Sequence, residues 1–340
     1  MATTIRNRTQ RSERGTARGG AARRVRRLPR PAGAAFGPTL TLDGGEPYGS
    51  DTPAHSLETL SSVAGGILES LAPRFLRDLN HEIRGRLAAS PIELNAYGYD
   101  PWGFNPDVAR RVLLMSALLY RYYFRVQTHG IENLPDGRML VIGNHAGQIA
   151  IDALMIGTAT VLEADPPRVL RGMGEYWLPT VPFVNVLMAR TGGVVGTPRN
   201  CIEILEHEEA VIAFPEGVRG MTKPFRQRYQ LQEFGYGFMR LALQTGTPIV
   251  PVAVVGSEEQ APSLGNFMPL ARLLGMPAFP LVVTPFPYPV RYHISFGEPM
   301  DFRGNPNDED DAIGKKVARV RARIHEMLQA GLRRRRSIFL

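Results

Sequence analysis

The chain has 340 residues and a formal net charge of +8, with 44% hydrophobic and 21% charged residues. This composition excludes an intrinsically disordered protein and is sufficient for a large hydrophobic core. The single cysteine, Cys201, excludes an intrachain disulfide and favours a reducing compartment. No apolar run reaches the roughly 18 residues that a membrane-spanning helix needs, so we expect any membrane association to be peripheral, at the cytoplasmic face.

The positive charge is concentrated at the N-terminus. Residues 1–36 hold ten arginines against one acid, Glu13, so the rest of the chain sums to about −1. Many glycines and few apolar residues predict a disordered tail. Three roles are open: a solvated tail, attraction to anionic membrane lipids, or binding of nucleic acid, which the lack of aromatic residues among the arginines disfavours. The composition also overlaps with that of an organelle transit peptide.

Residues 37–105 are expected to form a helical extension and a linker. Apolar residues recur at spacings of three and four over 57–87, which predicts a helix. The stretch YGYDPWGFNPD, residues 97–107, is typical of a linker because of its glycines and prolines. Asp107 is then expected to cap a helix over residues 108–125.

Residues 106–332 alternate β-rich runs with helical patterns, which predicts an α/β domain with a mostly parallel central sheet flanked by helices. Strands are expected at 138–143, 168–171, 193–196, 210–214, 249–255 and 292–296, and helices at 198–207 and 228–245. A last helix over 311–332 closes the core, and 333–340 form a basic C-terminal tail. The proline-rich stretch 276–292 predicts an apolar loop, either packed on the core or forming a wall for an acyl chain or a membrane-dipping surface.

The stretch VIGNHAGQIAID, residues 141–152, places a histidine directly after an apolar strand. A neutral imidazole at the carboxyl edge of a sheet can take a proton from an alcohol if a carboxylate holds its tautomer. Asp152 is the local acid. In one helix over 145–152 the two side chains would lie about 10 Å apart along the axis. We therefore expect a loop first and a helix from near Gln148, a path that Gly147 permits.

Two further predicted strands carry distinctive residues, one at its end and one within it. The stretch AVIAFPEGVRG, residues 210–220, ends in Glu216 and Gly217, with Arg219 two positions later. The planar guanidinium of an arginine suits phosphate or carboxylate, and a glycine lets a ligand approach the backbone. The stretch TGTPIVPVAVVG, residues 245–256, reads as a strand whose prolines place it at a sheet edge or at a kink.

Together these stretches resemble the glycerolipid acyltransferase family, which includes the lysophosphatidic acid and glycerol-3-phosphate acyltransferases. NHAGQIAID is similar to the family's first motif, FPEGVRG to its third and PIVPVAV to its fourth, over about residues 106–300. The resemblance implies that His145 is the general base for the acceptor hydroxyl, that Asp152 holds its imidazole and that Asn144 shapes the turn. The hydroxyl would attack the thioester of acyl-CoA or acyl carrier protein directly, without an acyl-enzyme, a metal or another cofactor.

The resemblance also implies a substrate site. Glu216, Gly217 and Arg219 would bind the glycerol and phosphate of a lysophosphatidic acid-like acceptor, and Pro251 would help to shape the acyl-donor pocket. The family's second motif normally ends in an arginine after an apolar strand, but RTGGVVGTPRN, residues 190–200, has Thr and Pro at that place. Arg199 is the candidate substitute phosphate ligand, and the alternative is a surface cation at a helix start.

The chain departs from the family pattern in two other places. Six residues separate His145 from Asp152 instead of four, and Val218 and Gly220 replace Thr and Ser, which removes two hydroxyl groups. These changes leave open a neutral acceptor, such as diacylglycerol or a long-chain alcohol, and a non-catalytic lipid-binding protein at a membrane surface. We expect Cys201 to be packed in the interior, and we expect neither a metal site nor a nucleic-acid partner. The oligomeric state is left open.

Overall fold

The computed structural model describes residues 73–145, 150–181, 183–273, 278–284 and 286–339. The Arg-rich tail over 1–36 and residues 57–72 of the helix expected over 57–87 lie outside these residues. The described end of that helix is α2 (Arg74–Ala88), which buries Leu79, Ile83 and Leu87. Their spacing of four residues places them on one face of the helix.

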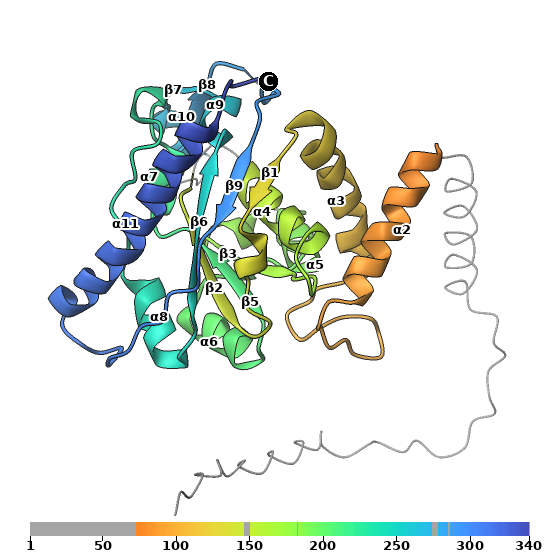
Figure 1. Cartoon of the computed structure of the whole chain (residues 1–340), viewed down its shortest axis with the longest axis horizontal. Coiled ribbons are helices and arrows are strands. Elements are labelled where there is room, and N and C mark those ends of the chain that lie inside the picture. The colour runs from red at the N-terminus through yellow and green to blue at the C-terminus, as the bar shows by residue number, and fades with distance from the viewer. Residues whose placement is uncertain (1–72, 146–149, 182, 274–277, 285, 340) are drawn as a thin grey trace, which may run out of the picture. The chain divides into compact units, whose positions relative to one another are not determined.

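The central sheet has seven strands: β1 (Gln127–His129), β2 (Met139–Gly143), β3 (Leu170–Gly174), β4 (Val194–Val195), β5 (Ala210–Ala213), β6 (Ile249–Val255) and β9 (His293–Phe296). Their order is β1-β9-β6-β2-β5-β3-β4 (Figure 1). The five strands from β6 to β4 run parallel, whereas β9 is antiparallel to β6 and parallel to β1. The predicted mostly parallel sheet flanked by helices is therefore confirmed.

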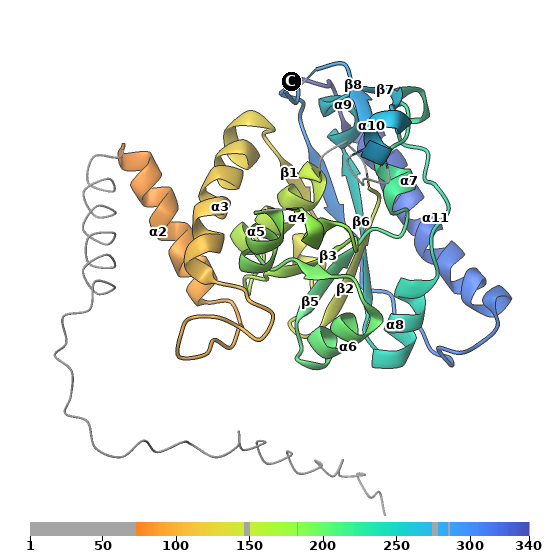
Figure 2. The ribbon, with the colours of Figure 1, turned by 180° about the vertical axis from the view of Figure 1, so that it is seen from behind.

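The remaining elements are α3 (Pro106–Leu118), α4 (Ile151–Leu162), α5 (Val184–Arg190), α6 (Pro198–Glu206), α7 (Val218–Met221), α8 (Gly237–Thr245), α9 (Ser257–Gln260), α10 (Met268–Leu273), α11 (Asp310–Arg334), the π-helix η1 (Leu119–Tyr123), the 3-10 helices η2 (Ile131–Asn133), η3 (Leu178–Thr180) and η4 (Phe225–Gln227), and a separate hairpin of β7 (Ser263–Asn266) and β8 (Pro280–Val282). Helices α6, α8 and α11 share a hydrophobic core with one face of the sheet, and α4 and η1 share another core with the opposite face (Figure 2).

Strand β2 shows why the sheet is predictable from the sequence. All of its residues from Met139 to Gly143 are buried. Leu140 and Ile142 enter the core beneath α6, α8 and α11, whereas Met139 and Val141 enter the core beneath α4. A continuous apolar run of this kind is expected of a central parallel strand, because both of its faces are covered.

The N-terminal extension packs outside α4. Helix α2 packs against α3, and α3 packs against α4 through a third apolar cluster. The predicted cap at Asp107 is wrong. The side chain of Asn105 accepts a hydrogen bond from the N–H of Val108, so α3 begins at Pro106 and Asp107 lies in its first turn. Asn is a strong cap and Pro is preorganised for the first helical position, which together fix this start.

The helix expected over 228–245 is shorter than predicted, because α8 begins at Gly237. In the preceding segment the backbone N–H groups of Tyr229 and Gln232 donate to the carboxylates of Glu258 and Glu216. Those distant carboxylates replace the carbonyls that a helix would supply as acceptors. The apolar periodicity persists since Leu231 and Phe234 are still buried.

Of the two positions predicted for the strand over 249–255, the sheet edge is wrong, because β6 lies between β2 and β9. The sheet accommodates Pro251 because of where it lies in the pairing of β6 with β9. It lies opposite Gly297, one residue beyond the end of β9, and its carbonyl accepts the N–H of Gly297 at 2.8 Å. The missing N–H of the proline thus falls where the regular antiparallel pairing stops.

The expected proline-rich loop over 276–292 holds the short strand β8, and residues 276, 277 and 285 of it lie outside the described residues. Its described apolar side chains divide into two groups. Val283 and Phe286 are exposed, whereas Val290 and Tyr292 at the end of the stretch are fully buried in the core beneath α4, so the loop packs on the core only at this end. Within the described ranges, no helix has both the length and the apolar character needed to cross a bilayer.

Candidate active site

The candidate site lies at the carboxyl ends of three neighbouring central strands, β6, β2 and β5. Asn144 and His145 directly follow β2, Phe214 to Glu216 follow β5, and α9 with Glu258 follows β6. Because these strands are parallel and adjacent, the residues after them meet at one edge of the sheet (Figure 1). Ligands of open α/β sheets bind at this edge.

His145 and Asp152 form a close, buried pair. The Nδ1 atom of His145 lies 2.8 Å from Oδ2 of Asp152, whose side chain has no exposed surface. Asp152 is in the first turn of α4, and its other oxygen accepts the N–H of Ala153. The expected helix start near Gln148 falls among residues 146–149, which the structure does not describe, and α4 is assigned from Ile151. A proton held on Nδ1 by the carboxylate leaves the lone pair of the imidazole on Nε2.

Neighbouring groups fix the orientation of His145. Its ring stacks on Phe214, with centroids 4.2 Å apart and planes 13° apart. Its backbone N–H donates to Oε1 of Glu216 at 3.0 Å. Asn144 extends the pairing of β2 with β6, because its side chain both donates to the carbonyl of Val254 and accepts the N–H of Val254. His145 is therefore held by the ring of Phe214 and by the carboxylates of Asp152 and Glu216.

Glu216 binds protein backbone on both of its oxygens. Oε1 accepts from His145, and Oε2 accepts the N–H of Gln232 at 2.7 Å. Its side chain is completely buried. Gly217, the next residue, has a φ of 55°, a left-handed conformation that favours glycine. In this arrangement Glu216 ties the loops after β2 and β5 to the segment before α8.

Helix α7 packs directly on the histidine loop. A Cβ atom on Gly220 would lie 2.8 Å from the carbonyl oxygen of His145 and 2.8 Å from Cβ of Glu216, so a serine at this position would collide with both. The absence of the usual hydroxyl therefore has a packing reason. Arg219, the preceding residue, is 58% exposed, and its guanidinium lies 3.2 Å from the carboxylate of Glu233. The structure thus brings the first and third motifs together.

Two charged residues of the site have no signal in the sequence motifs. The ammonium group of Lys223 is buried and lies 3.1 Å from Oε1 of Glu258 and 3.9 Å from Oε2 of Glu216. Burial raises the pKa of Glu258 to about 6, although Lys223 opposes this shift. Only the folded chain brings these side chains together, since Lys223 and Glu258 are 35 positions apart.

An apolar cavity of about 330 Å³ lies along α4, and its lining includes Ala153, the residue after Asp152, but neither Asp152 nor His145. Helix α4 contributes Gly157 and other residues to its wall, and the cavity reaches Ala150, two positions before Asp152. The rest of the lining comes from α3, α5 and strands β3 and β5, and it is mainly apolar: Val112, Leu113, Leu154, Leu170, Met188 and Ile212. This size is at the lower end of the range for ligand pockets.

Comparison with known proteins places the chain in a family. A family model described as "Acyltransferase" matches residues 125–255. An uncharacterised protein of Mycobacterium tuberculosis is 34% identical over 272 residues, which cover 76% of this chain and 74% of that protein. The chain belongs to the glycerolipid acyltransferase family. The matched region contains both the His145–Asp152 pair and the Glu216 loop.

Two more distant relatives of this acyltransferase have named activities. A mouse protein named "DGAT1/2-independent enzyme synthesizing storage lipids" is 24% identical over 244 residues, covering 70% of this chain and 71% of that protein. The crystal structure of the lysophosphatidic acid acyltransferase PlsC from Thermotoga maritima aligns with a TM-score of 0.46 at 21% identity, covering 67% of this chain and 81% of that chain.

Two other residues expected in the acyltransferase's site, Arg199 and Pro251, lie in α6 and in β6. Arg199 is in the first turn of α6, where its exposed guanidinium pairs with Glu203 at 2.9 Å. Pro251 lies inside the sheet opposite Ile142 and is not in the lining of the apolar cavity. Cys201 is buried, its Sγ is 3.1 Å from the sulfur of Met173, and burial raises the pKa of its thiol to about 11. Across the described residues, no three His, Cys, Asp or Glu side chains gather as metal ligands would.

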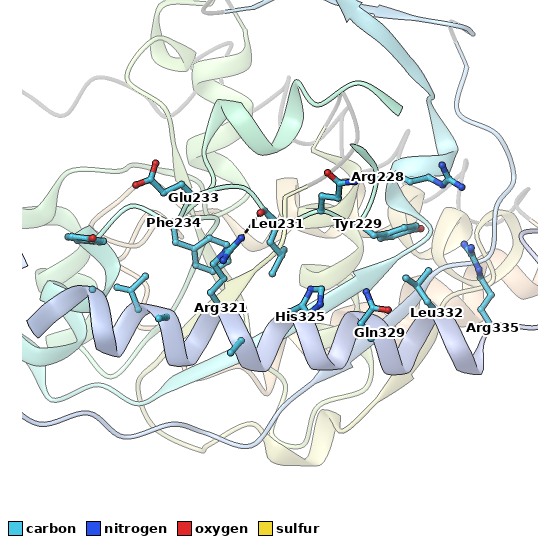
Figure 3. Close-up of a pocket in the computed structure, with 16 residues that line it drawn as sticks. Arg228, Tyr229, Leu231, Glu233, Phe234, Arg321, His325, Gln329, Leu332 and Arg335 are labelled. Atoms are coloured by element: carbon cyan, nitrogen blue, oxygen red, sulfur yellow. Dashed lines mark hydrogen bonds between the residues drawn. The ribbon is translucent and has the colours of Figure 1, made fainter. Parts of the chain in front are cut away.

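A larger hollow in the described part of the enzyme, of about 1160 Å³, is a groove along α11 rather than a space around His145 (Figure 3). Its opposite wall is the segment 228–236, and Arg321 of α11 donates to the carbonyl of Leu231 across it. His325 and Gln329 project from the helix into the groove (Figure 3). Neither His145 nor Asp152 lines this groove.

Proposed function

We propose that this acyltransferase moves a fatty acyl group from the thioester of acyl-CoA or acyl carrier protein to a hydroxyl of a glycerolipid. The observation that carries the proposal is the 2.8 Å contact between His145 and the buried Asp152 at the carboxyl edge of the sheet. A histidine oriented by a buried acid is the arrangement that general-base catalysis of alcohol attack requires.

In the proposed reaction Nε2 of His145 takes the proton of the acceptor hydroxyl as its oxygen attacks the carbonyl carbon of the thioester. The carbon–sulfur bond breaks, the ester forms, and the departing thiolate receives the proton from His145. Asp152 keeps the imidazole in one tautomer and stabilises its transient positive charge. The step balances without a metal or another cofactor, so we propose none.

The apolar cavity supplies a place for the acyl chain. Its walls of α3, α4, α5 and the sheet exclude water, and its lining includes Ala150 at the start of the helix that carries Asp152. Burial of a methylene group contributes about 0.8 kcal/mol, so a cavity of this kind binds a chain according to its length. We propose that the acyl chain of the donor occupies it while the thioester lies beside His145.

For the acceptor, we propose a lysophosphatidic acid-like molecule in phospholipid biosynthesis, whose phosphate Arg219 would bind. Arg219 is more than half exposed and lies one residue from Gly220, which packs on the histidine loop. The pairing of Arg219 with Glu233 is also exposed, and exposed pairs contribute little, about 0–1 kcal/mol, so a phosphate can displace the carboxylate.

A neutral acceptor, such as diacylglycerol or a long-chain alcohol, is the second candidate. It is favoured by the carboxylate of Glu233, which already neutralises Arg219, and by Val218 and Gly220 in place of hydroxyl residues. The name of the mouse relative, an enzyme that synthesises storage lipids, points in the same direction. In both versions we propose that the enzyme works as a peripheral protein at the cytoplasmic face of a membrane.

The test is acyl transfer by the wild type and by His145→Ala, with radiolabelled acyl-CoA and acyl carrier protein as donors. The acceptors are glycerol-3-phosphate, lysophosphatidic acid, diacylglycerol and a long-chain alcohol. We expect the substitution to lower kcat by about 10²–10⁴-fold with the preferred acceptor. The matched control is His325→Ala, a histidine on α11 outside the site. Equal transfer by wild type and His145→Ala would contradict the proposal, and the preferred acceptor decides between the two versions.

A further inference from the structure

The surface around α5 is rich in exposed apolar side chains. Five large ones lie within residues 176–187: Tyr176, Phe183, Val184, Val186 and Leu187. Phe183 is 87% exposed and Val186 is 56% exposed. Single exposed apolar residues are ordinary, but a group of this size on one short segment marks a surface that meets another apolar phase.

This surface borders the apolar cavity. Met188, which follows Leu187 in α5, and Thr191, just beyond the helix, line the cavity and are themselves half-buried. On the neighbouring helix α3, Val112 lines the cavity, and the exposed Met115 stands one turn further along. Both views of the molecule place α5 beside α3 (Figure 1, Figure 2). Exposed apolar side chains therefore lie next to the cavity lining on both helices.

We infer that the exposed apolar surface formed by Tyr176, Phe183, Val184, Val186 and Leu187, the last three on α5, docks on the surface of a lipid bilayer. The inference rests on the proposed function, because the glycerolipid acceptor resides in a membrane and must reach the acyl donor, whose chain occupies the cavity. With α5 in the interface, the cavity lies next to the bilayer that holds the acceptor. The exposed Tyr176 stands at the start of the segment, beside the half-buried Trp177, and a tyrosine ring favours the headgroup level of a bilayer.

The charge beside the segment also suits lipid headgroups. Arg111 of α3 is exposed and lies four residues before Met115, so both are on the same side of that helix. A cation at the rim of an apolar surface can bind lipid phosphate while its neighbours enter the acyl region, usually to a depth of about 5–10 Å. A protein partner seated on the same surface would instead cover the boundary of the cavity.

A second exposed apolar group, on the β7–β8 hairpin and the loop after it, is the natural rival. It includes Leu264, which is 74% exposed, and Phe286. Neither residue lines the apolar cavity. The two surfaces can therefore be separated by matched substitutions, one pair in each.

The experiment measures binding of the full chain to phosphatidylcholine vesicles by co-sedimentation. These vesicles carry no net charge, so the Arg-rich tail contributes little. The double variant Phe183→Asp, Val186→Asp is compared with Leu264→Asp, Phe286→Asp. We expect the first to weaken partitioning about tenfold or more and the second to stay within about twofold of the wild type, since each inserted apolar side chain contributes in proportion to its buried area. Phe183 has a φ of 65°, which aspartate accepts, so the first variant keeps the fold.

Unchanged vesicle binding by the first variant, or a loss confined to the hairpin variant, would overturn the inference. A dimer of the wild type in light scattering that the first variant alone converts to a monomer would also overturn it, because α5 would then bind a second copy of the chain. Acyl transfer to detergent-dispersed acceptor separates this proposal from the preceding one. The Phe183 and Val186 variant keeps that transfer, whereas His145→Ala loses it and still binds vesicles.

Native tryptophan fluorescence gives an independent readout. The chain has two tryptophans, and Trp102→Phe leaves Trp177 as the single reporter. We expect brominated phosphatidylcholine to quench Trp177 on vesicle binding to at most about half of its intensity, because it lies within the docking segment. Emission that brominated lipid leaves unchanged, with the protein bound to vesicles, would overturn the inference.

Discussion

Lys223 occupies a position where a single charge holds several loops together. Its ammonium group lies between the carboxylates of Glu216 and Glu258 and also donates to the carbonyl of Gln230 at 3.2 Å. Glu216 in turn accepts the N–H of His145. One buried cation therefore acts, through Glu216, on the loop that carries His145, the proposed general base. We therefore regard Lys223 as a positioning residue, which acts on His145 only through Glu216.

Replacing Lys223 by methionine should be strongly destabilising. It leaves two buried carboxylates without a cation, and breaking a buried ion pair in this way costs about 3–5 kcal/mol. The double variant Lys223→Met, Glu258→Gln should recover most of this loss, because it removes one of the two orphaned charges and keeps an acceptor for the N–H of Tyr229. The measurement is the free energy of unfolding in urea. A double variant no more stable than the single one would contradict the role given to Glu258.

The residues of the site differ in how far the sequence reveals them. His145, Asp152 and Glu216 are recognisable because each belongs to a motif at the end of an apolar strand, and the structure brings all three together. Lys223 and Glu258 are not recognisable, since their meaning lies in a contact between distant segments. Arg219 was placed near the site by its motif, but its pairing with Glu233 was not foreseeable, as that acid belongs to a segment expected to be helical.

At the level of elements, helix α4 links Asp152, the proposed catalytic acid, to the cavity proposed for the acyl chain. It carries Asp152 in its first turn and Gly157 in the cavity wall. A glycine inside a helix costs about 0.5–1 kcal/mol relative to alanine, so its presence calls for a reason. A Cβ atom on Gly157 would meet nothing within 4 Å, which shows that packing does not exclude a side chain there. Space left for a substrate would explain why the helix has a glycine at this position.

Gly157→Leu should therefore shorten the acyl chain that the enzyme accepts. The new side chain would fill part of a cavity of about 330 Å³, so transfer of the longest accepted chains should fall at least about tenfold, while shorter chains remain within about twofold. The measurement is kcat/KM across a series of acyl donors of increasing length.

Gly157→Ala is the matched control for this prediction. It removes the helix cost of glycine, so it should raise the free energy of unfolding by about 0.5–1 kcal/mol and leave the preference for chain length unchanged. A chain-length profile of Gly157→Leu identical to that of the wild type would mean that the acyl chain does not occupy this cavity.

Elements were predictable where local periodicity and tertiary contacts agree. The six expected strands are present, and most of them are apolar runs in the buried sheet, while α11 follows its stripe of apolar residues. Strand β3 is an exception, because it spans Leu170–Gly174 instead of 168–171 and contains the buried Arg171. Strand β1 was missed since its three residues, Gln127 to His129, are polar and exist as a strand through pairing with β9. The segment before α8 was mistaken for a helix because its buried Leu231 and Phe234 have helical spacing, whereas its N–H groups serve Glu216 and Glu258.

At the level of the whole molecule, strands β1 and β9 bring two histidines together at one side of the sheet. The rings of His129 and His293 are stacked with centroids 6.2 Å apart. Burial lowers the pKa of His293 to about 4, with the positive charges of His129, Arg335, Arg291 and Arg334 acting in the same direction. Burial and Arg334 also lower the pKa of His129. Among the described residues, neither ring nitrogen of His293 has a hydrogen-bond partner.

This arrangement predicts that acid destabilises the fold. The unfolded chain binds a proton at His293 with a pKa near 6.5, whereas the folded chain does so near 4, so the unfolded state takes up more protons between these values. Stability that is present above pH 6.5 is therefore lost as the pH falls toward 4. His293→Phe removes this titration. From pH 7 to pH 5 the wild type should lose about 1–2 kcal/mol more free energy of unfolding than the variant.

Urea unfolding at pH 7, 6 and 5 measures the difference, and His325→Phe is the control because that histidine is exposed on α11. Carboxylates elsewhere also titrate on acidification, but they are common to all three proteins and cancel in the comparison. The free energy of unfolding of the control should change with pH as that of the wild type does, since the fold does not bury the side chain of His325. If His293→Phe lost stability as steeply as the wild type, the buried histidine pair would not be the acid-sensitive element of the sheet.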